Sequence, residues 1–167
     1  MQELFEKQKQ KLVTLEQAKS IALQLKANGK KIGFTNGCFD CCHLGHIYSF
    51  METKRLCNVL FVAVNSDASV QKNKGPSRPI QDEKTRTILL ASMDFIDYVL
   101  LFDDKTALPI IKELRPDIIA KEGYTLDKWP EGRFVQSYGG KAIVLKRLKG
   151  YSTSDLIKKI KEKEWER

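Results

Sequence analysis

The sequence predicts an α/β fold: a doubly wound, five-stranded parallel sheet with a helical N-terminal arm. Short apolar runs alternate with helical patterns along the chain, which is typical of parallel strands joined by helical crossovers. The run at 59–65 (VLFVAVN) is apolar at almost every position, as expected of a central strand covered on both faces. The length of 167 residues suits one hydrophobic core.

Five short apolar runs are expected to form the strands of this sheet. Each is bounded by polar or turn-forming residues, and none is long enough to cross a membrane. Their ranges are 31–36, 59–65, 98–102, 117–121 and 142–145. Because ligands bind where the strands of such a sheet end, residues that carry chemistry should follow directly after these runs.

Helices are expected between the strands, where apolar residues recur at helical spacing or a capping residue begins a segment. Their ranges are 44–56, 82–93, 106–114, about 126–138 with an interruption near Pro130, and 156 to about 164. The polar stretch at 66–81 predicts a loop, because it contains Gly75, Pro76 and Pro79.

The N-terminal arm at 1–30 carries an apolar stripe at helical spacing. We expect this stripe to pack either on the single domain at 31–167 or on another subunit. A homo-oligomer, a dimer, is the expected state of the protein.

The formal net charge of +8 first raises nucleic acid as a partner. The excess lies at the two ends, however, since residues 1–31 carry +4, residues 141–167 carry +5 and the middle carries −1. Lysines in helical ends usually solvate an exposed face, so no nucleic-acid partner is expected. The first residues lack the apolar core of a signal peptide, which favours a cytoplasmic protein with no membrane partner.

The stretch 34–46 (FTNGCFDCCHLGH) is the most informative part of the chain. A buried strand leads into a turn at Gly37, and His43 and His46 follow at the start of a helix. Their spacing of three places both imidazoles on one helical face, while Gly45 allows a close backbone approach. A helix N-terminus offers free N–H groups and a partial positive charge. These features together predict a phosphate cradle.

Two other interpretations of this stretch remain open. The histidines could simply be satisfied within a helix cap. Alternatively, Cys38, Cys41, His43 and His46 could bind zinc, since Cys38 and Cys41 have a spacing found in zinc and redox sites. The zinc interpretation leaves the other polar loops of the chain without a role, whereas the phosphate cradle accounts for them. No resident metal site is therefore expected.

The motif Thr35-Asn-Gly-Cys-Phe-Asp40, followed by His43-Leu-Gly-His46, resembles the nucleotidyltransferase superfamily with an H-x-G-H signature. The resemblance runs from about Lys31 to Ile160. Further matching motifs are Val62–Asp67, Lys74–Pro79, Arg86 and Gly150–Ser154. Within the superfamily, these motifs are most similar to the branch that makes ADP-heptose from heptose 1-phosphate for the lipopolysaccharide core. The resemblance implies a Rossmann-like domain that transfers AMP from ATP with release of pyrophosphate.

The resemblance also implies which residues bind the nucleotide. His43 and His46 would contact the phosphates and the transition state, and Mg²⁺ would bridge triphosphate oxygens with few protein ligands. The segment at 150–154 begins a second helix whose N-terminus suits the β- and γ-phosphates. For Asp40, an indirect role toward the metal, an orienting role and a structural cap all remain open. The expected nucleotide-binding residues are Thr35, Asn36, Gly37, Cys38, Phe39, Asp40, Gly45, Asn65, Arg86, Lys121, Tyr151, Ser152 and Thr153.

The sugar phosphate is expected to bind beside this cradle. Lys72, Lys74 and Arg78 surround a Gly-Pro turn after a central strand, and Lys74 is expected to act in catalysis with the two histidines. Asp67 and Arg147 complete the expected acceptor site, Arg147 because it is similar to a phosphate-binding arginine of cytidylyltransferase relatives.

The sequence departs from the family where a K-G-G-D-Y motif is usual, because Lys121-Glu-Gly-Tyr-Thr125 stands there. A cytidylyltransferase acting on another phosphorylated alcohol or sugar, a nucleotide-binding regulator without catalysis and a zinc or thiol module remain alternatives. Intact His43, His46, Ser152 and Thr153 argue against the regulator.

Overall fold

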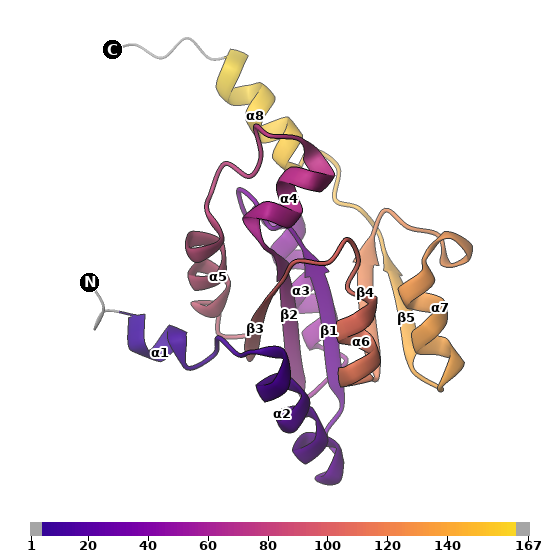
Figure 1. The fold of residues 1–167 in the computed structure, drawn as a ribbon. Helices are drawn as coiled ribbons and strands as arrows, with labels where there is room; N and C mark the ends of the chain where they lie inside the picture. The colour runs from indigo at the N-terminus through magenta and orange to yellow at the C-terminus, as the bar shows by residue number, and fades with distance from the viewer. Residues whose placement is uncertain (1–4, 163–167) are drawn as a thin grey trace.

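A computed structural model describes residues 5–162 of the chain and shows the expected sheet (Figure 1). The strands are β1 (Ile32–Gly37), β2 (Val59–Asn65), β3 (Tyr98–Phe102), β4 (Ile118–Glu122) and β5 (Lys141–Leu145). All neighbouring strands are parallel, and their order is β3-β2-β1-β4-β5. The predicted Rossmann-like, doubly wound sheet is confirmed.

The helices connect and cover the strands. They are α1 (Glu6–Lys9), α2 (Leu15–Ala27), α3 (Leu44–Lys54), α4 (Asp67–Lys74), α5 (Glu83–Ala91), α6 (Leu108–Leu114), the 3₁₀ turn η2 (Leu126–Lys128), α7 (Pro130–Ser137) and α8 (Thr153–Glu162). Across residues 5–162, each helix is too short or too polar to span a bilayer.

Two layers of apolar side chains lie on the two faces of the sheet. Strand β2 shows the alternation, because Phe61 and Ala63 pack toward α2, α6 and α7 while Leu60 and Val62 pack toward α3 and α5. Each residue of β2 after Val59 is buried. The N-terminal helix α2 contributes Ala18 to the first layer, so the arm packs on its own chain. Whether the protein forms a dimer stays a prediction.

The predicted loop at 66–81 is wrong in its first half, because α4 occupies Asp67–Lys74. The hydroxyl of Ser66 caps this helix by accepting a hydrogen bond from the Ser69 backbone N–H at 3.1 Å. The sequence does not predict this helix, because Val70 is its one buried apolar residue and the segment therefore has no apolar periodicity. Lys72 and Lys74 therefore lie on a helix and not on a flexible loop.

Helices α3, α5 and α6 lie within two residues of their expected bounds, and larger differences occur at α7 and α8. The predicted helix at 126–138 divides into η2 and α7, with Pro130 in the first turn of α7, where its missing N–H costs nothing. The last helix begins at Thr153 and not at residue 156, because Ser152 caps it by accepting from the Asp155 backbone N–H at 3.1 Å. Its predicted end near residue 164 lies outside the described residues.

Candidate active site

A cavity of about 510 Å³ opens at the carboxyl ends of β1 and β4. The chain runs from β1 outward to β3 and then returns to β4 on the other side, so this is the point where the strand order reverses. Figure 1 shows that α4 and α8 also lie beyond this end of the sheet.

Most of the predicted site residues line this one cavity. They come from the end of β1 and the turn after it, the start of α3, the region from α4 to the turn before α5, the end of β4, and the segment before and at the start of α8. The predicted residues that line it are Thr35, Asn36, Gly37, Cys38, Phe39, Asp40, His43, His46, Lys74, Arg78, Lys121, Arg147, Tyr151, Ser152 and Thr153.

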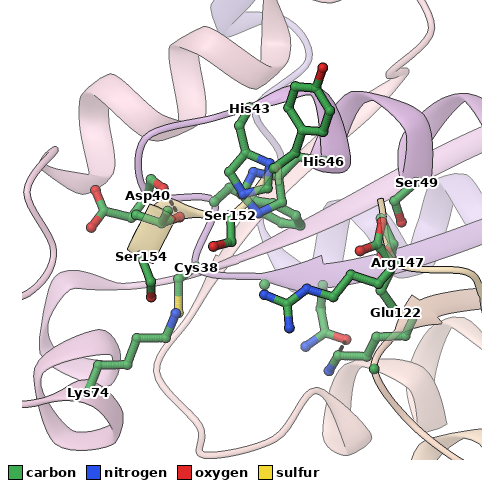
Figure 2. A pocket seen from close by; sticks show the side chains of 18 of the residues that line it. Cys38, Asp40, His43, His46, Ser49, Lys74, Glu122, Arg147, Ser152 and Ser154 are labelled. Atoms are coloured by element: carbon green, nitrogen blue, oxygen red, sulfur yellow. Dashed lines mark hydrogen bonds between the residues drawn. The ribbon is translucent and has the colours of Figure 1, made fainter. Parts of the chain in front are cut away.

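The two histidines form a stacked pair at the N-terminus of α3. Their ring centroids lie 3.8 Å apart with an interplanar angle of 20°, as the spacing of three residues predicts. The edge of the Phe39 ring packs against His46 from the other side, at 5.3 Å. The Nδ1 atoms of both histidines are buried and have no hydrogen-bond partner within the described structure. The pair therefore offers unused polar atoms to a ligand in the cavity (Figure 2).

Burial keeps both imidazoles neutral. It lowers the pKa of His46 to about 3, and the electrostatic effects of the neighbouring His43 and of the Lys74 charge act in the same direction. Burial also lowers the pKa of His43, assisted by Arg147 and opposed by Asp155. A neutral imidazole still has one N–H donor and one acceptor nitrogen, so an anion that enters can take a hydrogen bond from each ring.

The N-terminus of α8 meets that of α3 at this pair. The hydroxyl of Thr153 donates a hydrogen bond to the backbone carbonyl of Asp40 at 2.8 Å. Gly45 permits the approach, because a Cβ at this position would lie 3.2 Å from the Tyr151 carbonyl oxygen and 3.1 Å from the His43 ring. Two helix N-termini, each with free N–H groups and a partial positive charge, therefore face one cavity.

Asp40 organises the loop between β1 and α3. Its carboxylate is 1% exposed and pairs with Arg78 through Nη2 at 2.6 Å and Nε at 2.8 Å. It also accepts hydrogen bonds from the backbone N–H groups of Ile80 at 2.9 Å and Gln81 at 3.0 Å. Burial alone would raise the pKa of Asp40, but these bonds and the Arg78 charge hold it below its ordinary value.

Positive charges dominate the cavity wall. Lys74, Lys121 and Arg147 line it without a carboxylate partner in the described structure, while Arg78 is neutralised by Asp40. Figure 2 shows Lys74 and Arg147 on opposite sides of the histidines. The wall is thus suited to a ligand, or a pair of ligands, with several negative charges.

Five predicted site residues do not line the cavity. Arg86 and Asp67 pair with each other at 2.7 Å, and Arg86 is fully buried. The Arg86 side chain also donates to the carbonyl oxygens of Cys38, Asn65 and Gln81 at 2.7, 2.8 and 3.0 Å. These bonds occupy the guanidinium group. Arg86 therefore supports the loops that form the cavity and does not face into it. The Asn65 side chain donates a hydrogen bond to the Ser69 hydroxyl, and Lys72 is exposed on α4. Gly45 lies next to the His43 ring.

Four further residues line the cavity wall that the sequence did not predict to do so: Ser49, Glu122, Gly123 and Ser154. Ser49 follows His46 by three residues on the same helical face, so helical spacing could have identified it. Ser154 continues the helix start at Thr153. Glu122 gave a weaker signal, since it stands where the family usually has glycine.

The cysteines do not form a metal site. Across the part of the chain that the structure describes, no three His, Cys, Asp or Glu side chains gather closely enough to hold a metal ion. Burial raises the pKa of the Cys42 and Cys57 thiols to about 11, so both stay protonated. Cys57 packs against the apolar layer beneath α3 and α5. For the alternative built on Cys38 and Cys41, burial likewise raises the pKa of the Cys41 thiol, and the lack of a ligand cluster among the described residues argues against zinc.

Known proteins share this architecture and much of the sequence. The family described as Cytidylyltransferase-like matches residues 34–159. The bifunctional protein HldE of Paramagnetospirillum magneticum is 42% identical over 151 residues, which is 90% of this chain and 31% of that protein. HldE of Campylobacter jejuni is 45% identical over 157 residues, 94% of this chain and 32% of that protein. The chain thus spans about a third of the length of these relatives.

Solved structures agree with the fold. The crystal structure of the lipopolysaccharide core biosynthesis protein from Thermoplasma volcanium has a TM-score of 0.58 and 29% identity, covering 74% of this chain and all of that one. Pantoate-beta-alanine ligase from Francisella tularensis, in complex with an ATP ligand and beta-alanine, has a TM-score of 0.60. It is 16% identical and covers 92% of this chain and 79% of that one, so it supports the fold alone. The match over 34–159, together with the site at the ends of β1 and β4, shows that the chain belongs to the Cytidylyltransferase-like family.

Proposed function

We propose that the protein is a nucleotidyltransferase that transfers AMP from ATP to heptose 1-phosphate, giving ADP-heptose and pyrophosphate for lipopolysaccharide core synthesis. The observation that carries this proposal is the stacked pair His43 and His46, with unpartnered Nδ1 atoms between two helix N-termini. The family supports the reaction class, and the resemblance of the motifs supports the choice of substrates.

In the proposed reaction, a phosphate oxygen of the sugar attacks the α-phosphorus of ATP. The new bond joins that oxygen to the α-phosphorus, and the bond between the α-phosphorus and its bridging oxygen to the β-phosphate breaks. Pyrophosphate leaves with that electron pair. The nucleophile is already ionised at neutral pH, so the site needs no general base.

The residues of the cavity then act by positioning and by neutralising charge. His43 and His46 donate hydrogen bonds to the phosphate oxygens. The backbone N–H groups at Ser152 and Thr153 receive the β- and γ-phosphates, which become the leaving group. Asp40 fixes the positions of the histidines and of the α8 N-terminus relative to each other. Its carboxylate binds Arg78 and the turn at 80–81, and its backbone carbonyl accepts a hydrogen bond from Thr153.

We propose that Mg²⁺ enters as part of the nucleotide substrate. Asp40 and Glu122 are the carboxylates of the cavity wall, and Asp40 is occupied by Arg78 and two backbone N–H groups. This donor set suits an ion whose ligands are mainly phosphate oxygens and water, as is common for Mg²⁺ in sites of phosphoryl transfer. The ion would supply charge neutralisation on the triphosphate.

A panel of pyrophosphate-release assays tests the proposal. Each nucleoside triphosphate is combined with heptose 1-phosphate, glycerol 3-phosphate and other sugar phosphates. We expect ATP with heptose 1-phosphate to give the highest kcat/KM, whereas preference for CTP would favour the cytidylyltransferase alternative. His43→Ala and His46→Ala should each reduce turnover by roughly 100-fold while circular dichroism shows an intact fold. Turnover close to that of the unmodified protein in both variants would contradict the phosphate cradle.

A further inference from the structure

Glu122 has a polar atom for which the described structure provides no partner. It is the last residue of β4 and pairs in register with Leu145 of β5. Its Oε1 atom is buried and accepts no hydrogen bond, although the side chain lines the cavity. A buried acceptor without a donor is costly in a folded protein, so its retention requires an explanation.

Neighbouring cations do not satisfy this oxygen. Lys121 precedes it on β4, and its Nζ lies 3.5 Å from the Asn36 Oδ1 and 4.8 Å from the centre of the Tyr124 ring. Successive residues of a strand point to opposite faces, which directs Lys121 away from Glu122. The charge of Arg147 reaches Glu122, yet burial has the larger effect and raises the pKa of Glu122. Among residues 5–162, no ion pair within 4.0 Å joins Glu122 to a cation.

The charges divide the cavity into two ends. Figure 2 shows Glu122 and Arg147 at the right of the cavity and Lys74 at the lower left, with His43 and His46 above. The histidines and the two helix N-termini form the phosphate cradle, and Lys74 extends its positive charge in one direction, since Arg78 is neutralised by Asp40. The unpartnered oxygen of Glu122 calls for an N–H or O–H donor, and a carboxylate repels phosphate, so an uncharged donor group of a substrate suits this position better than a phosphate.

We propose that Glu122 is a specificity-determining residue that accepts a hydrogen bond from the nucleoside half of the nucleotide. This inference rests on the proposed function. Both substrates carry phosphate, and the acceptor brings its own negative charge toward the positive Lys74 end. The nucleoside and the sugar ring are the uncharged parts of the two substrates, and we assign the nucleoside to the Glu122 end because the acceptor is assigned to the Lys74 end. The donors of the nucleoside are the exocyclic amine of the base and the ribose hydroxyls.

Four substrates and three variants test the inference. The substrates are ATP, 2′-deoxyATP, 3′-deoxyATP and purine riboside triphosphate, which lacks the exocyclic amine. The variants are Glu122→Ala, Glu122→Gln, which keeps an acceptor oxygen, and Glu113→Ala as a control. Glu113 pairs with Lys19 and does not line the cavity. The readout is kcat/KM for pyrophosphate release, with each substrate varied separately.

We expect the unmodified protein to use one analogue about tenfold less well than ATP, as for the loss of a hydrogen bond to a charged group. Glu122→Ala should use ATP about tenfold less well and show no further loss with that same analogue. The analogue that behaves in this way identifies the donor. Glu122→Gln should retain part of the preference, and Glu113→Ala should retain all of it.

Three results would overturn the inference. One is that every analogue carries the same penalty in Glu122→Ala as in the unmodified protein. Another is that no analogue is penalised at all, and the third is a rise in KM for the sugar phosphate alone. If the unmodified protein releases no pyrophosphate with any nucleotide, the proposed function fails instead. Calorimetric binding of ATP and its analogues to the same variants would then still test Glu122.

Discussion

The Thr153 hydroxyl donates a hydrogen bond of 2.8 Å to the backbone carbonyl of Asp40, and this bond joins segments that lie 113 residues apart in the chain. It connects the first turn of α8 to the loop that leads into α3. Helix α8 has no fully buried residue, so burial of an apolar face contributes little to its position. We infer that polar contacts near its N-terminus set where α8 presents its N–H groups.

Thr153→Val should therefore displace the start of α8, because valine has the shape of threonine without the donor. We expect kcat/KM for ATP to fall by about five- to tenfold, in keeping with one lost hydrogen bond. Hydrogen exchange of the backbone amides at 151–156 should also become faster. Thr153→Ser keeps the hydroxyl and should retain most of the activity and protection. Equal losses in the two variants would show that the methyl group matters and not the hydroxyl.

The stability of the protein should depend on pH through His46. Because burial lowers the pKa of His46 from 6.5 to about 3, the unfolded chain takes up a proton at a higher pH than the folded chain. Its contribution is thus fully present above pH 6.5 and declines as the pH falls toward 3. Between pH 7 and pH 5 we expect a loss of about 2 kcal/mol in the free energy of unfolding.

Urea denaturation at pH 5, 6 and 7 measures this loss, with His46→Gln as the matched variant. The variant keeps a polar side chain but cannot titrate, so its stability should fall less over the same range. His43 remains in both proteins, and the comparison therefore isolates His46. Parallel pH dependences in the two proteins would show that the folded protein does not suppress protonation of His46.

Arg86 should affect stability more than nucleotide binding. Its fully buried guanidinium bonds three carbonyl oxygens and Asp67. Arg86→Met would leave those carbonyls unpaired, and we expect the free energy of unfolding to fall by about 3 kcal/mol. Asp67→Asn keeps an acceptor at a partly exposed position and should cost less. A stable Arg86→Met variant with a raised KM for ATP alone would instead support direct contact with the nucleotide.

The sequence was sufficient to predict the sheet and the grouping of His43 and His46 at the start of a helix, because both leave strong local patterns. The apolar run at 59–65 has a composition that few other structures share, and His43 and His46 stand three residues apart at the N-cap and in the first turn of α3. The contact between α8 and Asp40 could not be predicted in the same way, because it joins distant segments through a single hydroxyl.

The errors arise where a residue type is compatible with two environments. Arginine at position 86 suits a phosphate site as well as a buried hydrogen-bond network, and packing around Asn65 and Gln81 decides between them. Helix α4 is stabilised by its Ser66 cap and by Val70, which is too little apolar surface to give a periodic pattern. The sequence predicts that the fourth strand ends at residue 121, whereas β4 ends at Glu122. Glu122 was therefore not predicted to line the site.

Lys74 is expected to bind the phosphate of the acceptor, and a test of this role shows which part of the cavity each substrate occupies. It lies in the last turn of α4, lines the cavity, and its charge helps to lower the pKa of His46. A sugar phosphate that approaches the α-phosphorus adds negative charge to a site that already holds a triphosphate. Since the two helix N-termini carry only partial charges, a nearby lysine is needed to neutralise the second phosphate.

Lys74→Ala should thus raise the KM for the sugar phosphate by about tenfold, or about 1.4 kcal/mol, and the KM for ATP by less. Lys72→Ala is the matched control, because Lys72 lies in the same turn of α4 but does not line the cavity. Steady-state kinetics with each substrate varied separately measure the difference. If Lys74→Ala raises the KM for ATP alone, Lys74 binds the triphosphate and the acceptor site lies elsewhere. If Lys72→Ala has the same effect as Lys74→Ala, the charge of α4 acts at long range and not through contact with the acceptor.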